Sequence, residues 1–261
     1  MSAVLPLSTS PAESPSVTPV STTAPQVLQV EALTVSFDGF KAVDGLSLSI
    51  RRDELRVIIG PNGAGKTTLL DMICGKTRPT SGSVRFNGRE LVGLAEHAIV
   101  RAGVGRKFQT PSVYEDLTVM ENFEISIPGQ QDVLGSIFFR RNAGVRNRIE
   151  AVAEEVFLAS MLQQKAGRLS HGQKQWLEIG MLLIQSPELL LLDEPVAGMS
   201  PREREQTGDL LRRISRGKSV IVIEHDMDSR QAHRQHRDRA APGARAERRQ
   251  RGAGAGGPAR H

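Results

Sequence analysis

Apolar residues recur along the chain in two patterns that predict β-strands. Residues 29–50 read as two short strands around a turn at Asp38-Gly39, and residues 55–59 as a short strand with β-branched side chains. Residues 81–88 read as a strand that ends in an Asn-Gly turn. The segments 189–192 and 220–223 are continuously apolar, which is typical of central strands in a parallel sheet covered on both faces. These patterns predict a mixed α/β protein.

Helical patterns fill much of the remaining chain. We expect a helix at about 65–74, directly after the strand at 55–59, and a more helical texture from about 91 to 167. Within 146–161 the apolar residues recur at helical spacing, namely Ile149, Val152, Val156, Phe157 and Leu158. The pattern therefore predicts strands on both sides of a helical middle portion.

Size and composition agree with this prediction. The chain has 261 residues, which suits one α/β domain or two small ones, and 39% of its residues are hydrophobic. No apolar run reaches the ~18 residues that a membrane span needs. The single cysteine, Cys74, excludes an internal disulfide, and its place on a predicted helix favours a buried thiol.

The formal charge of +5 is unevenly distributed. Residues 229–261 contain nine Arg against Asp238 and Glu247, a net charge of +7, so residues 1–228 carry 5 − 7 = −2. The basic character belongs to the C-terminal segment alone. We therefore expect no specific nucleic acid partner for the rest of the chain.

One motif with a clear chemical meaning follows the strand at 55–59. Residues 60–67, Gly-Pro-Asn-Gly-Ala-Gly-Lys-Thr, fit the phosphate-binding P-loop pattern G-x-x-x-x-G-K-[ST]. Glycines let backbone N–H groups wrap a phosphate, and the following helix adds its positive end. Lys66 would reach the β- and γ-phosphates of a nucleotide, and Thr67 would offer its hydroxyl to Mg²⁺.

Acidic residues follow the apolar run at 189–192. Asp193 ends that predicted strand, where a carboxylate can hold Mg²⁺ through water, and Glu194 would point toward an attacking water. Three shorter motifs complete a series in chain order: Gln109 within Lys-Phe-Gln-Thr-Pro, residues 169–173 with the sequence Leu-Ser-His-Gly-Gln, and residues 223–226 with the sequence Ile-Glu-His-Asp.

Together these motifs make the chain resemble the ATP-binding subunits of ABC transporters over about residues 28–228, in particular those of branched-chain amino acid and urea uptake. Residues 35–41 and 169–181 resemble the urea-transport ATP-binding subunit, UrtD. The resemblance implies a P-loop NTPase core with a mainly parallel sheet, a small antiparallel β portion and a helical subdomain. It places an ABC ATPase cassette at 27–228, with the helical subdomain at about 91–170.

The resemblance also assigns roles to residues. It implies ATP and Mg²⁺ as ligands, Glu194, His225 and Gln109 as catalytic residues, and Thr67, Gln109 and Asp193 as metal-binding residues. The nucleotide-binding residues that it implies in one chain are Gly60, Pro61, Asn62, Gly63, Ala64, Gly65, Lys66, Thr67 and Thr68. Phe37, which lies 29 residues before Lys66, corresponds to an aromatic that stacks on adenine, although Phe40 is a competing candidate and a core position is the alternative.

Ser170, Gly172 and Gln173 match the ABC signature, in which His171 replaces the commoner glycine. In such proteins this motif binds the nucleotide of the facing subunit, so the resemblance implies a dimer with two ATP molecules at its seam. It further implies a second ABC ATPase subunit, two integral-membrane permease subunits and, indirectly, a periplasmic solute-binding protein. The expected location is the cytoplasmic face of the bacterial inner membrane, as a peripheral protein.

The two ends of the chain do not follow the family pattern. Residues 1–26 contain six Ser, four Thr and five Pro without Lys or Arg, so we expect a disordered segment and no secretory signal. Residues 229–261 contain no Val, Ile, Leu, Phe, Met, Trp or Tyr, where the family continues with a strand and a closing helix. A shifted reading frame near residue 229 would account for this disordered basic tail. The alternative is a genuine tail that binds nucleic acid or anionic lipid.

The main functional hypothesis is an ATPase subunit that energises import of urea or short amides. The alternatives are a branched-chain amino acid importer ATPase and an inactive product, because the tail leaves the activity of this chain open. A soluble ABC ATPase acting on DNA or ribosomes is disfavoured, since such proteins commonly carry two cassettes or a long coiled coil. A simple kinase or GTPase is excluded because the motif at 169–173 has no role there.

Overall fold

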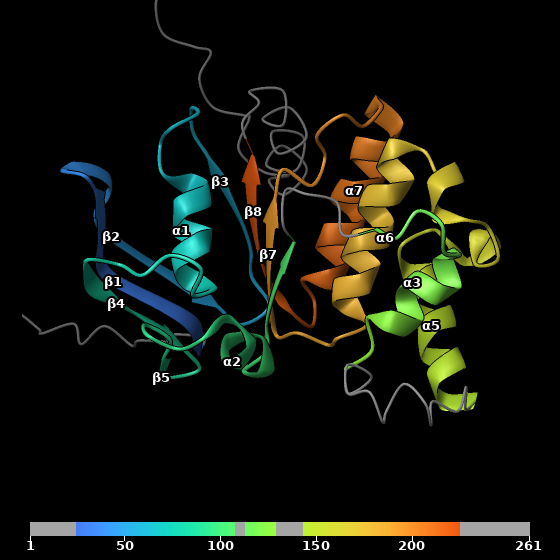
Figure 1. The fold of residues 1–261 in the computed structure, drawn as a ribbon, viewed down its shortest axis with the longest axis horizontal. Helices are drawn as coiled ribbons and strands as arrows, with labels where there is room; N and C mark the ends of the chain where they lie inside the picture. Colours follow the sequence, from blue (N-terminus) through green and yellow to red (C-terminus); the bar gives the residue numbers. More distant parts are fainter. Residues whose placement is uncertain (1–24, 108–112, 129–142, 225–261) are drawn as a thin grey trace, which may run out of the picture.

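Two four-stranded sheets organise the chain in the computed structural model, which describes residues 25–107, 113–128 and 143–224. The antiparallel sheet has the order β2-β1-β4-β5 and the parallel sheet the order β3-β8-β7-β6 (Figure 1). The antiparallel strands are β1 Gln26–Phe37, β2 Phe40–Arg51, β4 Ser81–Phe86 and β5 Arg89–Glu90. The parallel strands are β3 Leu55–Ile59, β6 Val104–Lys107, β7 Leu189–Asp193 and β8 Ser219–Glu224.

The β1–β2 hairpin confirms the two strands predicted within 29–50. Its turn consists of Asp38 and Gly39, whose φ angles are 48° and 87°, and Phe37 pairs with Phe40 across it. Glycine reaches positive φ at no steric cost, and aspartate tolerates it better than most residues, which explains the turn at this place. The predicted strand at 81–88 is β4, and it ends at the predicted Asn-Gly turn.

The continuous apolar runs form the two central strands of the parallel sheet, as predicted. Every residue of β7 and β8 is buried, and their side chains alternate between two hydrophobic clusters. Leu189, Leu191, Ile221 and Ile223 face one cluster, and Leu190, Leu192, Val220 and Val222 face the other. A sheet with a core on each face needs apolar residues at every position, because successive side chains point to opposite faces.

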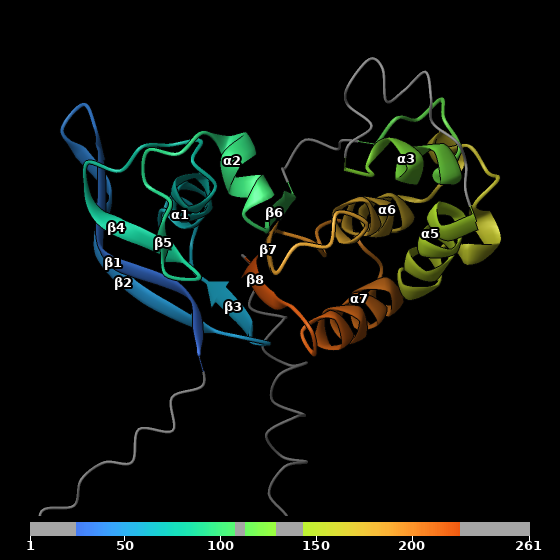
Figure 2. The same cartoon turned by 90° about the horizontal axis from the view of Figure 1, so that it is seen from below.

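One of these cores lies between the two sheets and contains α1 Lys66–Ile73. The helix follows β3 through the P-loop and buries Leu69, Leu70 and Ile73 against both sheets. Figures 1 and 2 show α1 in this position, with α2 Glu96–Arg101 near its C-terminal end. The predicted helix at 65–74 is therefore confirmed.

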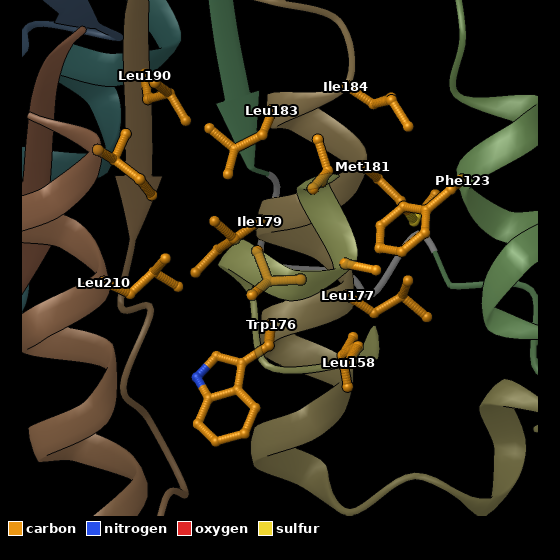
Figure 3. Close-up of a cluster of buried hydrophobic side chains, with 14 of the residues drawn as sticks. Phe123, Leu158, Trp176, Leu177, Ile179, Met181, Leu183, Ile184, Leu190 and Leu210 are labelled. Carbon is orange, nitrogen blue, oxygen red and sulfur yellow. The ribbon is translucent and has the colours of Figure 1, made fainter. Parts of the chain in front are cut away.

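The second core lies on the opposite face of the parallel sheet. It is built by α3 Val119–Ile125, α5 Ala143–Glu155, α6 His171–Leu183 and α7 Pro201–Ile214. In Figure 3, Trp176, Leu177 and Ile179 of α6 point toward different neighbours, because this helix is surrounded by the others and by the sheet. Short 3₁₀ turns at Ala159–Met161 and Ala166–Arg168 connect α5 to α6.

Two boundaries differ from the sequence prediction. The helical pattern at 146–161 predicted one element, but α5 ends at Glu155 because Phe157 takes a φ of 63°, which no right-handed helix can contain. The helical subdomain was expected at about 91–170, but β6 within that range belongs to the parallel sheet and pairs with β7. This strand was not predicted because two of its four residues, Arg106 and Lys107, are charged although they are buried.

Several expectations about the ends of the chain fall outside the described residues. These are the disorder of 1–24, the disorder of 229–261 and the absence there of the strand and closing helix with which the family continues. Gln26 was also expected to be disordered, but it begins β1. Among the described strands β3 pairs with β8 alone. None of the helices in the described part of the chain is long and apolar enough to cross a bilayer.

Candidate functional site

The P-loop, residues 60–67, connects β3 to α1 in a conformation that requires glycine. Gly63 and Gly65 have φ angles of 80° and 78°. A Cβ atom on Gly65 would lie 2.3 Å from the carbonyl oxygen of Ala42 and 2.9 Å from a methyl of Val43. The loop therefore packs directly on β2, and residue 65 is restricted both by its backbone angles and by its surroundings.

The side chain of Lys66 folds back over this loop. Its Nζ donates to the carbonyl oxygens of Gly60 at 2.6 Å and Pro61 at 2.8 Å, and the residue is buried. Helix α1 has no side-chain cap and no acidic residue in its first turn. An ammonium group and the positive end of a helix thus meet at the loop, an arrangement that favours an anion.

Thr67 joins the P-loop to the end of β7. Its Oγ1 donates to Oδ2 of Asp193 at 3.0 Å, and Asp193 is only 2% exposed. The two residues meet because β3, which leads into the P-loop, and β7 run parallel in one sheet. The carboxyl ends of parallel strands share one edge of a sheet, which is where ligands bind in open α/β folds.

Two further carboxyl groups lie at this edge, on Glu194 and Glu224. Glu194 has a φ of 49°, and its backbone N–H donates to the carbonyl oxygen of Ile223 at 3.0 Å, which fixes the turn after β7 to the end of β8. Glu224 is 8% exposed. Burial and the negative charge of Glu194 raise the pKa of Glu224 to about 7.

The signature residues lie at the start of α6. Ser170 caps the helix: its Oγ accepts the N–H of Gln173 at 3.2 Å, and Oε1 of Gln173 accepts the N–H of Ser170 at 2.9 Å. Gly172 is buried, and a Cβ atom there would lie 2.4 Å from Oε1 of Glu203. The local sequence thus builds a capping box whose glycine admits a side chain from α7.

His171, the departure from the commoner signature, contacts the loop that follows Glu194. Its Nε2 lies 3.1 Å from the carbonyl oxygen of Ala197, and a Cβ atom on Gly198 would lie 3.0 Å from the same ring. The ring therefore connects the start of α6 to residues 197–198. A glycine at position 171 could not make this contact.

The P-loop and residues 170–173 lie on different sides of the parallel sheet. Helix α1 contributes to the core between the two sheets, whereas α6 contributes to the core on the other face (Figure 1). The sequence-predicted site is thus divided into two groups in one chain. The P-loop, Asp193 and Glu194 form the first group, and Ser170, Gly172 and Gln173 form the second.

The remaining predicted residues are only partly located. Phe37 lies at the end of β1 and is 49% exposed, so it is not a core residue, and Phe40 is 69% exposed. Both belong to the hairpin whose second strand touches Gly65 through Ala42 and Val43. Gln109 and His225 lie outside the described residues.

Sequence reasoning missed two carboxyl groups near these motifs. In the sequence Glu224 is distinguished only as the neighbour of His225, and nothing in its local pattern indicates burial beside Glu194. Glu203 could have been found, because Ser200 and Glu203 have the spacing of a capping box that opens α7. Its contact with Ser170, 33 residues away, could not.

The fold and these motifs define an ATPase of the ABC type. A family model described as ABC transporter matches residues 43–197, and the chain belongs to this family. ATP binding and ATP hydrolysis, expected from the sequence, follow from that membership. Among its relatives is the high-affinity branched-chain amino acid transport ATP-binding protein BraF of Pseudomonas aeruginosa, 36% identical over 77% of this chain and 82% of BraF. LivG of Salmonella typhimurium, which carries the same description, is 34% identical over 77% of this chain and 82% of LivG.

Solved structures confirm the fold class. The ADP conformation of MJ1267, an ATP-binding cassette of an ABC transporter, superposes with a TM-score of 0.68 at 32% identity, over 78% of this chain and 82% of that one. The structure of cbiO1 from Clostridium perfringens has a TM-score of 0.67 at 27% identity, over 78% and 80%. The curated relatives carry names of branched-chain amino acid transport, so the expectation of a urea-specific subunit receives no support from them.

Proposed function

We propose that this chain is the ATP-hydrolysing subunit of an importer for branched-chain amino acids. The names of its relatives support the solute, and the contact between Thr67 and Asp193 is the observation that carries the chemistry. That contact joins a phosphate-binding loop to a buried acid at the end of a parallel strand. Both parts are needed to hold a nucleotide together with its metal ion.

The nucleotide phosphates would lie in the P-loop at the start of α1. Lys66 would exchange the carbonyl oxygens of Gly60 and Pro61 for phosphate oxygens, which are stronger acceptors for an ammonium group. Thr68 follows in the first turn of α1. Adenine would stack on Phe37, whose exposed ring belongs to the hairpin beside the loop, and Phe40 is the competing platform.

The residues present fit Mg²⁺, which prefers oxygen ligands and is commonly bound by one or two protein groups together with phosphates. Thr67 and Asp193 place a hydroxyl and a carboxylate oxygen 3.0 Å apart at the buried end of β7. We propose that these two residues hold the ion, with Gln109 as a third. The bound ion would offset phosphate charge.

Hydrolysis transfers the terminal phosphoryl group of ATP to water, giving ADP, phosphate and a proton. Glu194 follows Asp193 directly and is held by its hydrogen bond to Ile223, so its carboxylate is the proposed acceptor of the proton from water. We assign His225, one residue beyond the described end of β8, to contact with the terminal phosphate.

The second group of residues, Ser170, Gly172 and Gln173, would complete the site of a facing subunit. Their position on the opposite side of the sheet from α1 supports this division. The proposal therefore includes a second ABC ATPase subunit. It also includes two membrane permease subunits, a periplasmic solute-binding protein and a peripheral location at the inner membrane.

Two variants test the chemistry. Lys66→Ala is expected to abolish tight binding of Mg-ATP, because the loop loses its ammonium group. Glu194→Gln is expected to keep binding, to block turnover and to accumulate as an ATP-bound dimer, because a ligand buried at a seam stabilises association. Turnover by Glu194→Gln at the parent rate would contradict the assignment of the base.

Uptake measurements test the solute. Urea stays a second candidate because residues 35–41 and 169–181 resemble urea-transport subunits. Cells lacking the chain should lose uptake of labelled leucine and keep uptake of labelled urea. The reverse result would replace branched-chain amino acids by urea and leave the ATPase chemistry intact.

A further inference from the structure

The start of α6 carries a negative charge that comes from another helix. Oγ of Ser170 donates to Oε1 of Glu203, a residue of α7, at 3.1 Å. Helix α6 has no acidic residue in its own first turn. The carboxylate of Glu203 therefore supplies the anion that the positive end of a helix favours.

The same carboxylate lies against the α-carbon of Gly172. A Cβ atom on Gly172 would lie 2.4 Å from Oε1 and 2.6 Å from Cδ of Glu203. Hydrogen bonds from Ser200 lower the pKa of Glu203, so the group is charged at neutral pH. The carboxylate of Glu203 thus already occupies the place beside the Ser170 hydroxyl and the Gly172 α-carbon that an incoming phosphate oxygen would take.

The two oxygens of Glu203 have different partners. Oε2 accepts the hydroxyl of Ser200 at 2.7 Å and its N–H at 2.9 Å, which closes the capping box of α7. Oε1 accepts the hydroxyl of Ser170. Loss of the Oε1 contact would leave the cap of α7 in place, so the contact with Ser170 can be broken without unwinding either helix.

A serine hydroxyl has one hydrogen and can donate one hydrogen bond at a time. Oγ of Ser170 already accepts the N–H of Gln173, and its hydrogen is directed to Glu203. We propose that Glu203 is an internal competitor of nucleotide phosphate for the hydroxyl of Ser170, displaced when ATP on a facing subunit reaches the start of α6. This inference rests on the proposed function, in which Ser170 serves a facing nucleotide.

Through this competition Glu203 opposes closure of the dimer. A phosphate oxygen that approaches Ser170 meets a carboxylate of like charge, and like charges at an interface oppose association. Closure therefore requires the Oε1 contact to break, which raises the ATP concentration needed for dimerisation. His171 of the same motif contacts residues 197–198, so displacement of Glu203 from Ser170 would also shift the loop after Glu194.

The test uses the full chain carrying Glu194→Gln, in which ATP-bound dimers accumulate. Glu203→Gln keeps the size of the side chain and an oxygen acceptor for Ser200 but removes the charge. We expect half-maximal dimerisation, followed by analytical ultracentrifugation, at roughly five- to tenfold lower ATP concentration. Glu205→Gln removes an exposed charge from the same helix and serves as the matched control, which should behave as the parent.

Steady-state kinetics without the Glu194 substitution provide a second readout. Glu203→Gln should lower KM for ATP and change kcat by less than about twofold, whereas a merely structural residue would not increase affinity when removed. Should Glu203→Gln fold poorly, Glu203→Asp keeps an acid in the first turn of α7 but shortens the reach to Ser170. It should also lower the ATP requirement.

The outcomes separate this inference from the proposed function. If the parent dimerises with ATP and both Glu203 variants need as much ATP or more, Glu203 only caps α7 and the competition is disproved. If the parent neither binds ATP nor dimerises, the proposed function fails and the inference falls with it. A lower ATP requirement in the Glu203 variants, with Glu205→Gln unchanged, supports the competition.

Discussion

Nζ of Lys107 in β6 lies 3.2 Å from Oε2 of Glu178 in α6, and both side chains are about 5% exposed (5% and 6%). The neighbouring Arg106 points to the other face of the sheet, where Nη1 pairs with Asp71 of α1 at 2.6 Å. Consecutive residues of a strand face opposite layers. Strand β6 is therefore joined to both cores by buried charges, and Val104 is its one aliphatic side chain in these cores.

Removing one partner of the Lys107–Glu178 pair should be strongly destabilising. Lys107→Met removes the cation paired with a buried carboxylate, and the expected loss in the free energy of unfolding is about 3–5 kcal/mol. The double variant Lys107→Met/Glu178→Leu should recover most of that loss, because neither charge is then buried. Urea unfolding measures both values. Additive losses in the double variant would show that the pair is not coupled.

The two buried ion pairs of β6 explain why the sequence predicted some strands and missed this one. The segments 189–192 and 220–223 are apolar on both faces, so burial is visible in their composition. The sequence of β6, Val-Gly-Arg-Lys, contains two charges whose partners lie on helices far along the chain. Their burial depends on tertiary pairing, which no local pattern contains.

In the candidate site, too, local motifs could be predicted from the sequence, whereas most contacts between distant residues could not. Contiguous motifs such as residues 60–67 and 170–173 could be recognised because glycine, lysine and serine have fixed local roles there. The meeting of Thr67 and Asp193 was implied by their shared assignment to a metal ion, but two other contacts could not be predicted. The hydrogen bond from Ser170 to Glu203 and the burial of Glu224 beside Glu194 arise only when α7 and β8 take their places in the fold.

The two left-handed glycines of the P-loop should respond differently to alanine. At Gly63 nothing lies within 4 Å of an added Cβ, so Gly63→Ala carries only the backbone cost of positive φ, about 1–2 kcal/mol. At Gly65 the added atom would also meet the backbone of Ala42 at 2.3 Å. Gly65→Ala should therefore lower the urea unfolding midpoint much more and abolish ATP binding. Equal midpoints for the two variants would contradict the packing of the loop on β2.

The hydrogen bond from Thr67 to Asp193 should appear as a measurable coupling. A hydrogen bond to a charged acceptor contributes about 1.5–3 kcal/mol, and Asp193 is almost fully buried. A double-mutant cycle of Thr67→Val and Asp193→Asn, followed by urea unfolding without nucleotide, should give a coupling free energy of at least about 1 kcal/mol. Both single variants should also lose the thermal stabilisation that Mg-ATP gives the parent. Independent, additive effects would place the two groups out of contact.

Glu224 should make the stability of the nucleotide-free chain depend on pH. Its pKa is raised to about 7 by burial and by the charge of Glu194, whereas a glutamate in an unfolded chain ionises near ~4.3. Between these values the unfolded chain releases the proton and the folded chain retains it. This carboxyl group therefore lowers the free energy of unfolding as pH rises from about 4.3 to about 7, and adds no further pH dependence above that range.

Glu224→Gln removes this titration and keeps the shape of the side chain. At pH 4.5 the variant and the parent should have similar free energies of unfolding. By pH 8 the variant should be the more stable of the two by on the order of 2 kcal/mol, after allowance for solvent screening of a group near the sheet edge. Urea unfolding at several pH values, without nucleotide or Mg²⁺, measures the difference, and Glu205→Gln controls for the loss of an exposed charge. A difference that stays constant across this pH range, or that favours the parent as pH rises, would mean that Glu224 ionises normally and that Glu194 and burial do not act on it as the structure indicates.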